Sequence, residues 1–194
     1  MPRISTPTLS QHRDWRRQQL IAAASAIALQ DGGSAVTVAA VAEKAGLSRT
    51  SVYEYFASSA ELVADLVIEE LTVFAHSLQD AVALTSDPYD AIDSWISAAL
   101  RYIGDGRHLL AKALSSTSMP KDRAGEIGAA HRALLAPMYQ ALKEIGITDV
   151  AQALTLIQGV TDASTKRIES GSDAELESIT ATNFCVAGIR ALVP

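Results

Sequence analysis

Residues 37–56, TVAAVAEKAGLSRTSVYEYF, constrain the fold of this chain more than any other segment does. Behind Thr37, whose hydroxyl can cap a helix, apolar residues recur at helical spacing. Gly46 predicts the end of this helix, because the residue just past a helix often has a left-handed backbone that glycine adopts without a clash. Ser48 can then cap a second helix. The segment therefore predicts two short helices joined by a tight turn.

The second of these helices has one apolar face and an outer surface rich in hydrogen-bond donors. Val52 and Phe56 are four residues apart, so they share the face that turns inward. A tight turn followed by such a helix is typical of a helix-turn-helix, in which the second helix lies in the major groove of DNA with its N-terminal residues at the base edges. The polar and aromatic side chains left for the other faces are Arg49, Thr50, Ser51, Tyr53 and Tyr55.

Helical segments flank this motif on both sides. A helical run from Arg16 to Gln30 precedes it, and FASSAELVADLV follows it, with Ser58 as the cap of a long helix. In this order of segments, over about residues 13–70, the chain resembles the TetR family of transcriptional regulators. The resemblance implies a three-helix DNA-binding head and a helical part that binds a small molecule. The rest of the chain carries no motif that can be matched.

Eight residues are candidate DNA contacts: Thr37, Ser48, Arg49, Thr50, Ser51, Tyr53, Tyr55 and Arg17. Arg49 lies at the start of the second helix, where its side chain can form paired hydrogen bonds with a guanine. Tyr53 and Tyr55 are expected to contact phosphates, a role that the resemblance implies for Tyr53, and partial burial is the alternative for Tyr55. Thr37 and Ser48 can offer hydroxyls to phosphate as well as capping their helices.

Three positions depart from what is common in the resembled family. Ser59 stands where a lysine is common, so that a phosphate contact is lost or replaced by a hydroxyl. Thr50 stands where glycine is common, and Ala39 leaves a possible base-contact position without a polar group. We therefore expect affinity to depend on Arg49 and the N-terminal arginines.

Composition favours an all-α fold. Of the 194 residues 48% are hydrophobic but only 5% are aromatic, and strand-type alternation is scarce. No apolar run approaches the roughly 20 residues that span a bilayer, and the N-terminal residues lack a secretory signal, so we expect a cytoplasmic protein. The single cysteine, Cys185, cannot form an internal disulfide and is expected to be an apolar core or interface residue.

The net charge of −6 is unevenly distributed. Residues 1–56 hold six basic and four acidic side chains, and the remainder of the chain is acidic. Phosphate contact needs only local positive charge and hydroxyl or backbone donors, so this distribution is compatible with DNA binding. It predicts modest non-specific affinity and a shallow dependence on salt for each subunit.

Three parts are expected along the chain: a mobile N-terminal arm over residues 1–12, the DNA-binding domain over 13–60, and a ligand-binding and dimerisation domain over 61–194. In the last part Pro137 interrupts a helical pattern, where its missing N–H should kink or split the helix. The helices expected after the motif are 58–84, 88 to the GDG sequence at 104–106, 107–114, 122–145, 149–170 and 174–193.

The last two helices carry apolar faces that suit assembly. The resemblance implies that such a pair meets its two-fold copy in a four-helix dimer interface, and a homodimer would present two heads to two half-sites of DNA. Packing of these faces on their own subunit is the alternative. The expected interface residues are Leu156, Val160, Ala163, Ile179, Val186 and Ile189.

The resemblance also implies a small-molecule inducer, although the sequence does not identify it. The larger side chains that could line a cavity between helices are Trp95, Tyr102, His108, Met119, His131, Met138, Tyr139 and Phe184. The four histidines lack metal-ligand spacing, so neither a metal nor another cofactor is expected.

The sequence contains no phosphate-binding loop, zinc-protease motif or nucleophile elbow, which argues against an enzyme. The resemblance to the TetR family implies instead a DNA-binding regulator, a repressor that its ligand releases from a palindromic operator. The alternative is an all-helical ligand-binding or protein-interaction module without specific DNA binding.

Overall fold

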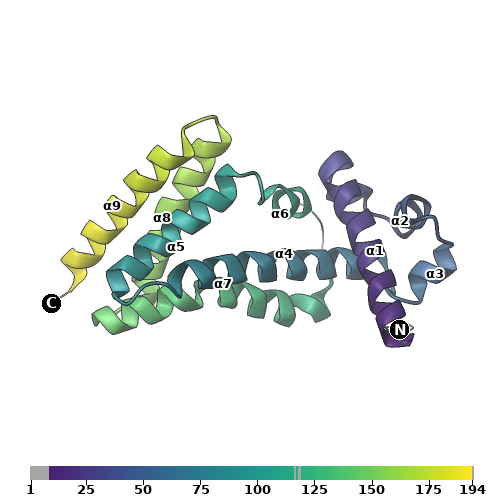
Figure 1. The fold of residues 1–194 in the computed structure, drawn as a ribbon, viewed down its shortest axis with the longest axis horizontal. Coiled ribbons are helices and arrows are strands. Elements are labelled where there is room, and N and C mark those ends of the chain that lie inside the picture. The colour runs from purple at the N-terminus through teal and green to yellow at the C-terminus, as the bar shows by residue number, and fades with distance from the viewer. Residues whose placement is uncertain (1–8, 116, 118, 194) are drawn as a thin grey trace, which may run out of the picture. The chain divides into compact units, whose positions relative to one another are not determined.

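The computed structural model describes residues 9–115, 117 and 119–193 of the chain. Over these residues it is all-α, as the composition predicts, with two short 3-10 helices and no strand (Figure 1). The elements are α1 (Leu9–Asp31), η1 (Gly33–Ala35), α2 (Val38–Ala45), α3 (Arg49–Tyr53), α4 (Ser59–Val82), α5 (Pro88–Gly104), α6 (Leu109–Leu114), η2 (Lys121–Arg123), α7 (Ala124–Ile145), α8 (Val150–Glu169) and α9 (Ala174–Leu192).

The chain forms two compact units, which we call the head and the helical body. The head comprises residues up to Glu69 together with 110–127, and the body comprises 70–109 and 128 onward. This division differs from the expected boundary at residues 60 and 61, because the head takes more of α4 and also a segment far along the sequence. That segment belongs to the head because Leu110 and Leu114 are buried in its core.

The close approach of this segment explains the glycine at position 33. A Cβ built on Gly33 would overlap Oγ1 of Thr117 and would lie 2.7 Å from the carbonyl oxygen of Ala113. Both distances are far shorter than van der Waals contact, and the carbonyl of Ala113 belongs to the backbone, which cannot rotate away as a side chain can. Only glycine therefore fits where η1 meets the segment after α6.

The first helix begins earlier than its hydrophobic pattern suggests. Residues 9–12, expected in the arm, form the first turn of α1, and the rest of the expected arm lies outside the described residues. The reason is local, since residues 9–15 contain no glycine or proline that would stop a helix. Further along, Leu20 and Ala24 of α1 are fully buried against the inward faces of α2 and α3.

The body core is built on the stripe predicted for α5. Asp87 caps this helix by accepting hydrogen bonds from the backbone N–H groups of Tyr89 and Asp90, and Pro88 occupies its first turn as expected. The predicted stripe is buried throughout: Ala91, Ile92, Trp95, Ile96 and Ala99.

The sequence predicts a kink or a split of the helix at Pro137, and the split is wrong, because α7 runs continuously through this residue. A proline inside a helix leaves the preceding turn short of one hydrogen bond. In that turn the carbonyl of Leu134 accepts a hydrogen bond from Nε1 of Trp95 at 2.9 Å. A side chain of α5 thus supplies polar contact where the helix ladder of α7 is weakest.

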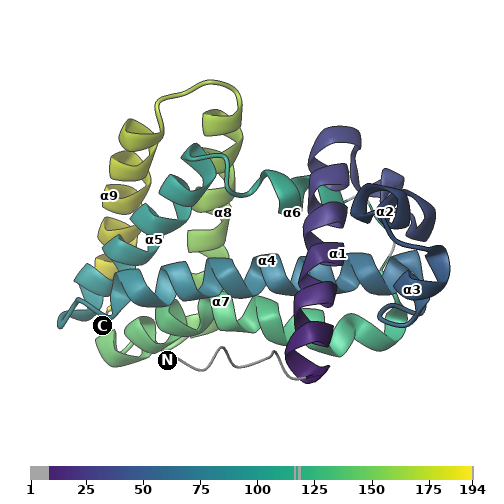
Figure 2. The ribbon, with the colours of Figure 1, turned by 45° about the vertical axis from the view of Figure 1, so that its right-hand side comes forward.

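The last two helices, α8 and α9, are antiparallel neighbours, as their short link predicts (Figure 2). Asp149 caps α8 through the N–H of Gln152, and Asp173 caps α9 through the N–H of Leu176. No helix within the described residues is long and apolar enough to cross a membrane.

Candidate DNA interface

The helix-turn-helix forms as the sequence predicts. Oγ1 of Thr37 accepts the N–H of Ala40 at 3.1 Å, and Gly46 ends α2 with a left-handed backbone at φ 67°. Oγ of Ser48 then accepts the N–H of Ser51 at the start of α3. The second helix ends at Tyr53, earlier than the motif suggests, and a turn brings Phe56 into the core.

The surface of α3 carries the predicted contact residues at its exposed positions. Arg49, Thr50 and Tyr53 are exposed, and the Tyr53 side chain is 56% exposed although it is aromatic. Arg49 has no hydrogen-bond or ion-pair partner among the described residues. Its guanidinium is therefore available to another molecule at the N-terminal end of α3.

The hydroxyls at the start of α3 are partly engaged within the motif. Oγ atoms of Ser48 and Ser51 lie 3.0 Å apart and share a hydrogen bond. Thr37 uses its hydroxyl oxygen as a cap but remains exposed. Since each of these oxygens keeps a free lone pair or proton, a further contact with another molecule remains compatible with capping.

Tyr55 is half-buried against the head core, which agrees with the alternative of partial burial that the sequence left open for this residue. The guanidinium carbon of Arg13 lies 6.0 Å from the centre of its ring. Tyr55 thus has a packing role that Tyr53 lacks, and it lies at the edge of the hollow next to α1.

Arg17 is held inside the head. Its Nη2 donates to Oδ2 of Asp65 at 2.5 Å, and its guanidinium lies over the ring of Phe56 at 5.7 Å. These contacts join α1 to α4 and to the end of the motif. They engage a side chain that the sequence suggested as a DNA contact.

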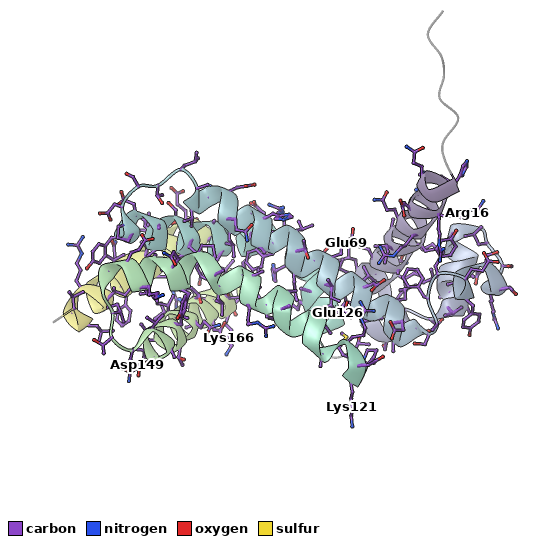
Figure 3. The ribbon with its side chains drawn as sticks, turned by 90° about the horizontal axis from the view of Figure 1, so that it is seen from below. Arg16, Glu69, Lys121, Glu126, Asp149 and Lys166 are labelled. Carbon is purple, nitrogen blue, oxygen red and sulfur yellow. The ribbon has the colours of Figure 1, made fainter. Side chains whose placement is uncertain are left out.

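Two of the N-terminal arginines, which the list of eight candidate contacts does not name, lie beside the end of the motif instead. Arg13 and Arg16 of α1, with His12, line a hollow whose other wall is Glu54 and Tyr55. Figure 3 shows Arg16 on α1 next to this end of the motif. The signal in the sequence was the spacing of one helical turn between residues 12, 13 and 16, which gathers three basic groups on one face.

Ser59 has a structural role in the head. Its Oγ accepts the backbone N–H of Val38 at 3.0 Å, and so it satisfies one of the free N–H groups in the first turn of α2. The first turn of α4 is thereby tied to the first turn of the motif. A lysine at this position could not accept that hydrogen bond.

Behind the motif, an ion-pair network on Arg123 fastens α4 to the start of α7. Arg123 donates to Oε2 of Glu61 and Oδ1 of Asp65, each at 2.7 Å, and to Oε1 of Glu126 at 2.8 Å. The hydrogen bonds that Arg123 donates to Asp65, Glu126 and Glu61 raise its pKa further above its ordinary value. All four side chains belong to the head, and Figure 3 shows Glu126 in the first turn of α7.

The body contains a cavity of about 280 Å³ between α4, α5, α7 and α8. Of the eight side chains expected to line such a space, only Trp95 is among its described lining residues. The described lining residues are Phe74, Trp95, Ala99, Leu100, Ile103, Leu134, Leu135, Gln158, Thr161, Asp162 and Thr165.

The other expected cavity residues are dispersed. Met119 packs against the core of the head and Met138 is buried in the core of the body. His131, Tyr139 and Phe184 are exposed. The size of a side chain alone could not distinguish these environments, because the local sequence pattern around each of these residues is compatible with either a core or a surface position.

Tyr102 and His108 have partners of their own in the body. Tyr102 stacks on Phe74 with ring centres 4.3 Å apart, and Arg107 lies over its ring at 4.4 Å. Burial, and then the charge of Glu70, raise the pKa of Tyr102, against an opposing effect of Arg107. His108 Nε2 lies 3.0 Å from Oε1 of Glu169.

The outer face of α8 and α9 is apolar and unpaired within the described part of the chain. Leu156 and Ile179 of the expected interface are about half exposed, and Ala163 is exposed. Phe184 is 68% exposed on the same helix pair. Of the remaining expected residues, Val160 and Val186 are half-buried and Ile189 is buried in the body core.

Within the described residues, no group of three histidine, cysteine or acidic side chains could hold a metal ion. Cys185 is a free thiol, buried in the body core as its sequence context suggests. Burial raises its pKa to about 11.

Residues 20–66 match the family described as bacterial regulatory proteins, tetR family. No curated protein matches the chain. The matched region contains α2, α3, the second half of α1 and the first turns of α4, which together make up the helix-turn-helix and its support.

Solved structures of regulators have a similar fold over most of both chains. The transcriptional regulator FadR from Bacillus subtilis, in complex with stearoyl-CoA, is 20% identical with a TM-score of 0.73, covering 88% of this chain and 98% of that chain. The TetR family regulator PfmR from Thermus thermophilus is 18% identical with a TM-score of 0.69, covering 87% and 97%. The ketosteroid regulator KstR2 of Mycobacterium tuberculosis is 22% identical with a TM-score of 0.62, covering 89% and 94%.

Proposed function

We propose that this chain, whose residues 20–66 match the tetR family of bacterial regulatory proteins, is a homodimeric repressor that binds an operator through α3 and leaves it when a small molecule occupies the body. Members of this family are non-enzymatic transcription factors. The observation that carries the proposal is the exposed, unpartnered Arg49 at the start of α3.

Base recognition is assigned to Arg49. An arginine at the first turn of a recognition helix can donate two hydrogen bonds to O6 and N7 of a guanine, worth about 1–3 kcal/mol of discrimination. Thr50 is exposed beside it and can add a methyl or hydroxyl contact. Ala39 on α2 is half-buried and has no polar group, so the base contacts of one head are concentrated at the start of α3.

Phosphate contact is assigned to groups on both sides of α3. Tyr53 is exposed on α3, and Arg13 and Arg16 approach from the first turns of α1. Arg17 is excluded from this set because its guanidinium is held by Asp65. Its role in binding is to fix α1, and with it Arg13 and Arg16, against the motif.

A dimer is proposed through the outer face of α8 and α9. This face exposes Leu156, Ile179, Phe184 and Leu192, a concentration of apolar surface that a monomer rarely leaves uncovered. A two-fold dimer would cover it and present two heads to the two halves of a palindrome. Since one head has few basic groups, two heads are needed for useful affinity.

The cavity of the body is the proposed ligand site. The FadR protein from Bacillus subtilis, which has a similar fold, is in complex with stearoyl-CoA in its solved structure. In this chain the cavity is about 280 Å³, too small for a molecule of that size without rearrangement. A more compact ligand is therefore proposed here.

Retention of the purified protein on duplex DNA, measured over a range of salt concentrations, tests this function. We expect binding in the absence of ligand that weakens as salt rises, because each phosphate neutralised contributes about 0.9 to the slope of log affinity against log salt. Replacing Arg13 and Arg16 with alanine should lower that slope, whereas Lys143→Ala, an exposed change on the body, should leave it unchanged. No retention at low salt would contradict the proposed function.

A further inference from the structure

We propose that the cavity of the body accepts a small organic cation, in which an apolar or aromatic portion lies among the side chains of α4, α5 and α7 and an ammonium pairs with Asp162 of α8. The inference rests on the proposed function, because it names the chemical class of ligand for the same cavity.

The lining divides into an apolar wall and one polar edge. Seven of the eleven lining residues are apolar and come from α4, α5 and α7. The polar edge comes from a single face of α8, where Gln158, Thr161, Asp162 and Thr165 recur at helical spacing. None of the described lining residues is a lysine, arginine or histidine.

Two of the hydrogen-bond donors at the cavity are engaged within the protein, whereas the side-chain amide of Gln158 and the hydroxyl of Thr165 remain available. Nε1 of Trp95 donates to the carbonyl of Leu134, so the indole N–H is not available to a ligand. Oγ1 of Thr161 donates to the carbonyls of Ile157 and Gln158, which leaves its lone pairs as acceptors. The described lining therefore offers an anionic ligand only these neutral donors and no positive charge to replace its hydration.

A negatively charged acceptor, by contrast, is available to a ligand in the cavity. The carboxylate of Asp162 has no hydrogen-bond or ion-pair partner among the described residues. Lys166 follows Asp162 by one helical turn but neither lines the cavity nor pairs with it. A ligand ammonium can approach Asp162 from the cavity, and the rings of Phe74 and Trp95 in the wall favour a cation over an anion.

The charge of the body acts in the same direction. Residues 70–109 and 128–193 hold thirteen aspartates and glutamates but only seven lysines and arginines. Such a surplus raises the local concentration of cations and lowers that of anions. The volume of the cavity also limits the size of the ligand, because about 280 Å³ suits a single-ring amine.

Three probes with the same apolar portion separate charge from hydrophobicity: phenylbutylammonium, phenylbutanol and phenylbutanoate. Binding to the full chain is measured by calorimetry, and by Trp95 fluorescence in a Trp15→Phe background. We expect the ammonium to bind about fivefold more tightly than the alcohol, as for a partly exposed ion pair, and the carboxylate to bind most weakly.

The decisive variant is Asp162→Asn, which keeps the shape of the side chain and removes its charge. It should abolish the fivefold preference for the ammonium and leave the affinity of the alcohol unchanged. The matched control is Asp80→Asn, which removes one exposed carboxylate of the body outside the cavity and should preserve the preference.

Equal binding of ammonium and carboxylate, an unchanged preference in Asp162→Asn, or no binding of any probe would overturn the inference. Retention on duplex DNA, measured in the same preparations without probe, reports the proposed function independently. Retention without cation preference contradicts only the inference, whereas cation preference without any DNA retention contradicts only the proposed function.

Discussion

Nη2 of Arg17 lies 2.5 Å from Oδ2 of Asp65, and this ion pair fastens α1 to α4 within the head. The other oxygen of the same carboxylate accepts from Arg123 at 2.7 Å. Asp65 therefore joins two arginines that are 106 residues apart in the sequence. Its side chain is only 16% exposed, and loss of its charge would leave Arg17 without an ion pair among the described residues and Arg123 with Glu61 and Glu126 alone.

Asp65→Asn should lower the free energy of unfolding of the head by about 1–3 kcal/mol, because an amide oxygen is a weaker acceptor for two guanidinium groups. Urea unfolding followed by circular dichroism measures the change. Glu69→Gln, at an exposed position one turn further along α4, is the matched control and should stay within about 0.5 kcal/mol of the original chain. Equal midpoints for the two variants would show that the network contributes nothing.

Gly33→Ala should destabilise the head by about 1–3 kcal/mol, because the new methyl group would meet Thr117 and the backbone of Ala113. The control is Gly125→Ala, whose methyl group would meet nothing within 4 Å in the first turn of α7. That change should be neutral or stabilising by up to about 1 kcal/mol. If thermal unfolding moves the two variants in the same direction, the close approach at Gly33 is wrong.

The sequence predicted the head more closely than the body, for physical reasons. In residues 37–56 the caps Thr37 and Ser48 and the turn at Gly46 act through neighbouring residues, so local spacing identifies them. The contact between Gly33 and the segment after α6 joins residues about eighty positions apart, so no local sequence pattern could predict it. Nor does a helical pattern reveal that Arg17 turns to Asp65 while Arg13 and Arg16 remain beside α3.

The cavity was the least predictable feature. Its lining combines one face from each of four helices, and the spatial register of those faces depends on packing. The position of Pro137 was clear from the sequence, but the continuity of α7 through it was not. There, the indole of Trp95 supplies the turn before the proline with a hydrogen bond from another helix.

Cys185 should react slowly with iodoacetamide at pH 8 in the folded protein, because its pKa is raised to about 11 by burial. Since the folded state holds the thiol proton more tightly than the unfolded state does, the associated stability is present below about pH 9 and is lost as the pH rises toward about 11. Cys185→Ala should flatten this part of the profile, measured by urea unfolding at several pH values. An identical alkaline profile in both proteins would contradict the assignment.

Phe184→Glu should convert the dimer into a folded monomer, since it introduces a charge into the centre of the apolar face of α8 and α9. Light scattering at micromolar concentration measures the mass, and circular dichroism checks the fold. Leu84→Glu is the control, because Leu84 is 91% exposed just past the end of α4 and belongs to neither α8 nor α9. A monomer in the unsubstituted protein, or loss of the dimer in both variants, would refute this interface.

The central claim is that α3 reads a DNA sequence, and selection from a pool of randomised duplexes tests it most directly. The unsubstituted protein should enrich two inverted half-sites, with a guanine at one fixed position in each. Arg49→Ala should lose the preference at that guanine, at a cost of about 1–3 kcal/mol, while Lys143→Ala on the body retains it. Enrichment of no sequence by the unsubstituted protein, or the same guanine preference in Arg49→Ala, would contradict sequence reading by α3.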